Sequence, residues 1–188
     1  MRERGRLTGM STNLAPRWAV RVAHLIPLLT LPVALWRLAW VFELPIGWEA
    51  AFYTAATDDW HDKLYLLGLS VLTEALALLS LGLVRRWGEV VPRWVPLLGG
   101  RPIPPLAATV PAGLGAAGLI VLWTPLPWMF LGPAQGGAPD GNGWELLMAV
   151  CYLPQMLWGP LLALLTVAYH RRRKGLSLTS REAVASVP

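Results

Sequence analysis

Long apolar runs separated by polar loops dominate this chain of 188 residues. A run must hold about 20 mostly apolar residues to cross a hydrocarbon core of ~30 Å as a helix, in which every backbone polar group is satisfied internally. Four runs qualify, and the predicted spans cover residues 18–42, 64–84, 106–123 and 145–169. The pattern therefore predicts an all-α, polytopic membrane protein with a four-helix transmembrane bundle over residues 18–169.

The segments on either side of this bundle are polar and basic. Residues 1–17 are predicted to form a cytoplasmic N-terminus, for which Met1 and Met10 are alternative starts. The first apolar run exceeds the roughly 7–15 residues of a signal-peptide core, and no A-x-A cleavage pattern follows it, so we expect an uncleaved signal anchor. Residues 170–188 are expected to form a basic and disordered cytoplasmic tail.

Composition agrees with a membrane protein rather than a soluble enzyme. Hydrophobic residues make up 55% of the chain and charged residues only 14%, whereas about 25% is typical of soluble domains. The net charge of +5 does not indicate nucleic-acid binding, because such binders gather their charge on a soluble surface. The single cysteine, Cys151, excludes an internal disulfide and CxxC chemistry.

Basic residues next to the spans predict the orientation in the membrane. Of the 16 lysines and arginines, 14 lie in the N-terminal segment, in the loop between spans two and three, and in the tail. The two opposite loops hold Lys63 as their one cation together with seven carboxylates. Because cytoplasmic loops are enriched in Lys and Arg, we expect a multi-pass protein of the plasma membrane with both termini in the cytoplasm.

The loop before the third span, together with that span, has a recognisable sequence. It reads WGEVVPRWVPLLGGRPIPPLAATVPAGLGA over residues 87–116 and contains Pro–Arg–Trp and Gly–Gly–Arg elements. This stretch, about one sixth of the chain, resembles a segment of four-span integral membrane proteins of high-GC Gram-positive bacteria. The resemblance implies a bacterial membrane protein of that fold, and the family carries no established activity to transfer.

Polar side chains inside the predicted spans are candidates for function, because an ionisable group there costs about 2.5–3.5 kcal/mol on insertion scales. From the ~1.5 Å rise per residue, Arg37 lies about 8 Å and Glu74 about 15 Å from the outer ends of their spans. Residues three or four apart share a helix face. The candidate intramembrane polar core consists of Arg37, Ser70, Glu74, Tyr152 and Gln155.

Two interpretations of this polar core stay open. In the structural one, Arg37 reaches toward Glu74 or extends outward, and the polar groups hold the helices together. In the functional one, Glu74 titrates or binds a cation in a cavity that opens outward, as in a proton-coupled carrier.

Small residues predict helix-packing faces, because they let backbones approach closely. Such rows can join helices within one chain or between the chains of a homo- or hetero-oligomer. The predicted rows are Gly68, Ala75 and Gly82 on the second span and Ala108, Ala112 and Ala116 on the third.

Two charged clusters outside the spans are further candidates. The basic run Arg171, Arg172, Arg173 and Lys174 is expected to meet anionic lipid headgroups. Asp58, His61 and Asp62 have the side chains of a metal site, although a solvated acidic loop explains them more simply. We therefore expect no metal, and the sequence indicates no cofactor.

No GxSxG, HExxH, Walker or GxGxxG pattern is present, so the chain lacks the signatures of the common enzyme classes. The leading hypothesis is a non-enzymatic membrane subunit or interaction protein, with the loop after span two and the basic tail as contact surfaces. The alternative is a small ion-coupled carrier or channel that uses Glu74.

Overall fold

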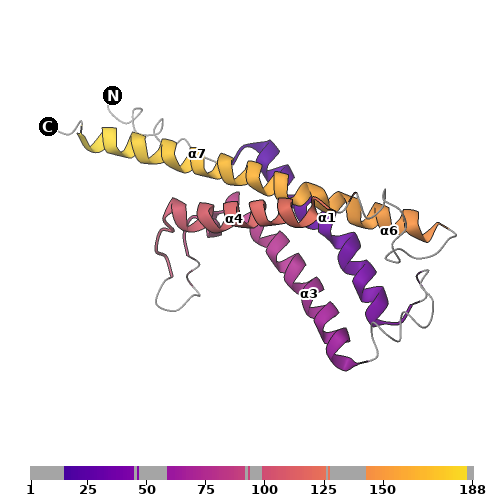
Figure 1. Cartoon of the computed structure of the whole chain (residues 1–188). Helices are drawn as coiled ribbons and strands as arrows, with labels where there is room; N and C mark the ends of the chain where they lie inside the picture. Colours follow the sequence, from indigo (N-terminus) through magenta and orange to yellow (C-terminus); the bar gives the residue numbers. More distant parts are fainter. Residues whose placement is uncertain are drawn as a thin grey trace.

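The computed structural model describes residues 15–44, 46, 59–91, 93, 99–125, 127 and 143–185, and side-chain surroundings as far as Gly175. The chain is an all-α bundle of four long helical segments (Figure 1). Two of them are the single helices α1 (Arg17–Val41) and α4 (Pro105–Trp123). The second segment is α3 (Trp60–Leu79), which the short 3-10 turn η1 (Ser80–Leu83) continues. The fourth combines α6 (Trp144–Tyr152), the 3-10 turn η3 (Leu153–Leu157) and α7 (Trp158–Ala185).

All four segments are long and apolar enough to cross a membrane, with mean hydropathies between 1.5 and 2.0. Each coincides with one predicted span, so the predicted fold class is confirmed. Charges separate toward the two ends of the bundle. One end, which we call the basic end, contains Arg17, η2 (Arg86–Gly88), the start of α4 and the charged part of α7. The other, which we call the acidic end, contains Glu43 and the start of α6.

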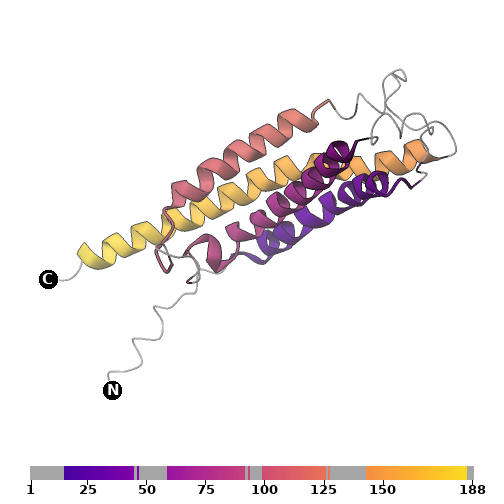
Figure 2. The same cartoon turned by 90° about the horizontal axis from the view of Figure 1, so that it is seen from below.

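The helices pack as two pairs, α1 with α3 and α4 with α7, and α1 joins the pairs by contacting α7 (Figures 1 and 2). A buried cluster near the basic end includes Ile26, Trp158 and Tyr169. A smaller cluster near the acidic end contains Trp36, where its ring meets Trp144 edge-on at 6.4 Å. Lys63 and Glu43 form an ion pair at the acidic end. The hydrogen bond from Lys63 and its positive charge lower the pKa of the Glu43 carboxyl.

Proline changes the geometry of the fourth segment. Pro154 has no N–H to donate, so the α-helical hydrogen bonding stops there, and the five residues of η3 adopt the tighter 3-10 form. This turn brings Gln155 into the bundle, where the residue is only 1% exposed. By contrast, α1 stays helical through Pro27 and Pro32.

The C-terminal segment differs from our expectation. We expected disorder over residues 170–188, yet α7 continues as a helix to Ala185. Two physical reasons account for the longer helix. Arg, Lys, Glu, Leu and Ala are good helix formers, and arginines in the first turns beyond Tyr169 bond to neighbouring backbone, as described below. The apolar span therefore ends within a longer helix.

The predicted small-residue rows behave differently from one another. On α4, Ala116 is buried, and Ala108 and Ala112 pack against the core. On the second segment Gly82 is buried, whereas Gly68 and Ala75 lie on its exposed face. The α4 row is therefore a packing face within the chain, and most of the other row is not.

The close approach of α4 and α7 involves a glycine outside these rows. A Cβ on Gly159 of α7 would lie 2.8 Å from Ile120 Cγ1, 2.9 Å from the Ile120 backbone nitrogen and 3.1 Å from the Ala116 carbonyl oxygen. Two of these three atoms belong to the α4 backbone, which cannot rotate away as a side chain does. Only glycine therefore permits the observed crossing of α4 and α7.

We predict that Gly159→Ala forces these helices apart and costs about 1–3 kcal/mol, as overpacking typically does. Thermal unfolding of the purified protein in detergent measures the loss. The matched control is Gly113→Ala on α4, where a new Cβ meets nothing within 4 Å and alanine favours the helix. Equal melting temperatures for the two variants would contradict the close-approach argument.

Candidate functional site

The structure brings part of the predicted polar core together around Arg37. Its guanidinium donates a long hydrogen bond of 3.5 Å to Thr73 Oγ1 on the neighbouring helix α3. Arg37 also lies close enough to the Tyr152 hydroxyl of α6 to interact with it electrostatically. One cation thus connects three helical segments in the half of the bundle toward the acidic end.

Ser70 and Thr73 face the interior but satisfy their hydroxyl protons locally. Ser70 Oγ donates to the Leu66 carbonyl at 2.9 Å, and Thr73 Oγ1 donates to the Leu69 carbonyl at 2.7 Å. The Thr73 oxygen keeps lone pairs free, which is why it can accept from Arg37. The Ser70 hydroxyl therefore bonds within its own helix and not to Arg37.

Glu74 is not paired with Arg37: no ion pair joins them in the part of the chain that the structure describes. Its Oε1 atom is buried and has no hydrogen-bond partner there, and the same is true of Gln155 Oε1. Buried acceptors without donors are costly. These two oxygens are available to accept hydrogen bonds or to coordinate a cation.

A second polar cluster lies at the basic end and connects α7 to the loop of residues 85–104. We call Tyr169, Arg172 and Arg173 the α7 clamp. Tyr169 donates to the Gly88 carbonyl at 2.9 Å, and Arg173 donates to the Ile103 carbonyl at 2.9 Å. The clamp thus holds the loop at both its beginning and its end.

Arg172 is the centre of this clamp. Its Nη2 atom bonds to the Glu89 carboxylate at 2.7 Å and to the Leu83 carbonyl at 3.2 Å, and its guanidinium lies 5.6 Å from the Tyr169 ring centre. The Arg172 and Glu89 side chains are only 11% and 26% exposed. This shielding makes the ion pair stronger than one on an open surface.

The loop has its own backbone pairing, which complements the clamp. Ile103 N–H donates to the Glu89 carbonyl, Val91 N–H donates to the Arg101 carbonyl, and an isolated bridge joins Val90 to Pro102. The two ends of the loop therefore pair with each other in an antiparallel manner and lie against α7.

The basic run expected to meet lipid headgroups is thus divided by the structure. Arg172 and Arg173 face the loop and bond to it, whereas Arg171 and Lys174 are exposed. The period of the helix explains this division, because neighbours in sequence lie about 100° apart around its axis.

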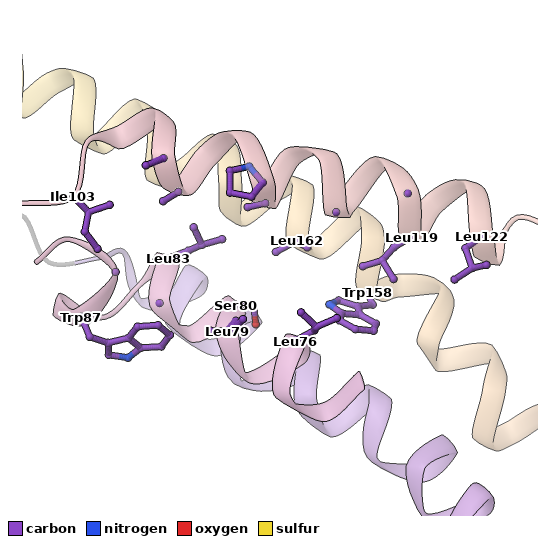
Figure 3. A pocket seen from close by; sticks show the side chains of 18 residues that line it. Leu76, Leu79, Ser80, Leu83, Trp87, Ile103, Leu119, Leu122, Trp158 and Leu162 are labelled. Carbon is purple, nitrogen blue, oxygen red and sulfur yellow. The ribbon is translucent and has the colours of Figure 1, made fainter. Parts of the chain in front are cut away.

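An apolar groove of about 710 Å³ separates α3 and η1 from α4 (Figure 3). Leu76 and Leu83 lie on one wall, and Ala112 and Leu119 lie on the other. Trp158 and Leu162 of α7 form the floor, and Trp87 with Ile103 closes the basic end. The groove exists because α4 packs chiefly on α7 and makes no comparable contact with α3.

The metal candidate is only partly described. Asp58 lies outside the described residues, and the Asp59 carboxylate both caps the start of α3 and bonds to the His61 ring at 2.9 Å. Among the residues that the structure does describe, no group of three His, Cys, Asp or Glu side chains is arranged to hold a metal ion.

Sequence reasoning missed two contributors to these sites and the glycine at the crossing of α4 and α7. Thr73 and Tyr169 were overlooked because a threonine or tyrosine in an apolar span is unremarkable until a partner from another helix is known. A signal was present for the clamp, since Tyr169, Arg172 and Arg173 recur at helical spacing on one face. Gly159 carried no such signal.

We predict that Arg172→Gln destabilises the clamp by about 2 kcal/mol, the typical contribution of hydrogen bonds to charged groups. The melting temperature should fall, and trypsin should cleave faster after Arg93 in the loop, an exposed arginine that is not followed by proline. Arg171→Gln removes the same charge from an exposed position and should leave both measurements unchanged. Unaltered cleavage at Arg93 in Arg172→Gln would show that the clamp does not hold the loop.

Comparison with models of known protein families, with curated proteins and with solved structures found no match for this chain. The assignment of a function therefore depends on the chain's own residues and their geometry.

Proposed function

We propose that the chain is a non-enzymatic membrane subunit or interaction protein of a bacterial plasma membrane, with both termini in the cytoplasm. The observation that carries the proposal is the α7 clamp. A loop rich in Trp, Pro and Arg is fastened to a charged helix by side-chain bonds to Gly88, Glu89 and Ile103. A loop that is held in one conformation by these bonds offers a preformed surface to which another molecule can bind.

The surface so presented is mixed in chemistry. Trp87 and Val90 are more than two-fifths exposed, and Arg86, Arg93 and Arg101 are exposed beside them. Aromatic and arginine side chains are enriched at protein interfaces. A partner with acidic and apolar groups at the membrane surface fits this arrangement.

A carrier that uses Glu74 is the second candidate, and a specific observation favours it. Two buried side-chain oxygens, Oε1 of Glu74 and Oε1 of Gln155, have no hydrogen-bond partner among the described residues. Unpartnered polar atoms inside a span are features of ion and proton pathways. It ranks second because Glu74 forms no ion pair with a cation among the residues that the structure describes.

Proteoliposomes with an imposed pH or sodium gradient separate the two functions. We expect neither the wild type nor Glu74→Gln to move protons or sodium beyond the level of empty vesicles, and we expect both to form the same complex on native gels of membrane extracts. Glu145→Gln, at an exposed position, is the matched control. Wild-type flux that Glu74→Gln abolishes and Glu145→Gln retains would favour the carrier.

The proposed orientation has its own test in a Cys151→Ser background. We expect Glu145→Cys to react with an impermeant thiol reagent added outside intact cells, because the acidic end should face outward under the positive-inside rule. Arg171→Cys should react only after the membrane is opened. Both positions are exposed on the protein, so a reversed pattern of labelling would refute the orientation.

A further inference from the structure

The apolar groove is separate from the polar core, and its basic end adjoins the contact surface assigned above, with which it shares Trp87. We propose that it binds an acyl chain of an anionic phospholipid whose phosphate lies among the arginines at the basic end. This inference does not depend on the proposed function, because either a subunit or a carrier can hold such a lipid.

The chemistry of the groove selects a hydrocarbon. Its walls and floor are formed almost entirely by leucine, alanine, glycine and tryptophan residues (Figure 3). Ser80 carries the one hydroxyl among the lining residues, and its Oγ atom already donates to the Ala77 carbonyl. Apart from the indole N–H groups of Trp87 and Trp158, the lining side chains offer a ligand no free hydrogen-bonding group. A polar ligand would therefore lose most of its hydrogen bonds to water here.

The groove also has a suitable length and entrance. Lining residues on α4 extend from Ala107 to Leu122, which is roughly 22 Å at a rise of ~1.5 Å per residue. This exceeds half of a ~30 Å hydrocarbon core, the depth that a chain of one leaflet occupies. Leu76, Leu79 and Leu122 on the two walls are about half exposed or more, so a chain can enter from the side.

Charge identifies the headgroup. Arg172 bonds to the carbonyl of Leu83 and Arg173 to that of Ile103, and both of these partners line the groove at its basic end. Arg86 and Arg101 are exposed and flank Trp87 and Ile103 in sequence.

Among the residues whose side chains the structure describes, Glu89 is the one carboxylate at this end, and Arg172 is paired with it. The groove therefore ends in surplus positive charge. A phosphate with no compensating cation of its own complements that charge, whereas a zwitterionic headgroup brings an ammonium that opposes it.

The test uses the purified full chain in detergent and measures lipid binding by native mass spectrometry. The probes are phosphatidylglycerol and phosphatidylcholine with identical acyl chains. We expect phosphatidylglycerol to bind at least about fivefold more tightly, which corresponds to one cation near an anionic headgroup. Equal binding of the two lipids by the wild type would overturn the proposal.

Groove-filling variants test where the chain binds. Gly115→Phe places a ring in the groove, because a Cβ at Gly115 points toward Leu162 at 4.0 Å, and it should abolish binding of both lipids. Gly113→Phe, on the same helix but outside the groove lining, should retain binding. If Gly115→Phe does not fold, Leu76→Trp fills the groove from the α3 wall. Retained lipid binding in a folded groove-filled variant would overturn the proposal. A change of oligomeric state in that variant would also overturn it, because the groove would then be an interface for a second copy of the chain.

Charge variants test the headgroup site. The double variant Arg86→Gln/Arg101→Gln should bind phosphatidylglycerol and phosphatidylcholine equally. Arg17→Gln/Arg21→Gln removes the same charge from exposed positions on α1 at the same end and should keep the preference. If both double variants lose it, the preference reflects general surface charge and the proposed headgroup site is wrong.

Discussion

The position of α4 depends on a single close crossing with α7. Only 11% of the most apolar stretch of α4 is buried, the smallest share among the four segments, and its contacts are chiefly with α7. Gly159 permits that contact by letting α7 approach the α4 backbone around Ala116 and Ile120. Because α4 packs chiefly on α7, it does not pack closely against α3. The apolar groove is the space left between α4 and α3.

Positive charge at the basic end has two roles in this protein. Along the sequence, arginines and lysines gather next to the ends of the spans, and the proposed orientation rests on this pattern. In the folded chain, helical periodicity turns Arg172 and Arg173 toward the loop, where they bond to backbone and to Glu89. Arg171 remains exposed. The same run of residues therefore orders the loop and leaves cations at the surface.

Much of the fold could be predicted from the sequence, and less of the site. The four spans follow from apolar runs of sufficient length, because the bilayer imposes that length on any spanning helix. Arg37, Glu74 and Gln155 could be singled out as polar residues in apolar surroundings. Their partners could not, since the bond between Arg37 and Thr73 depends on how α1 and α3 are rotated about their axes.

The sequence by itself determined the number of spans, their helical state and the separation of charge between the two ends, because each depends on local composition and on the thickness of the bilayer. Tertiary structure alone decided that Glu74 is not paired with Arg37, that the α7 clamp holds the loop, and that α4 leaves a groove beside α3. Those features depend on the crossing and rotation of helices distant in sequence, where neighbours in space are set by packing rather than by order along the chain.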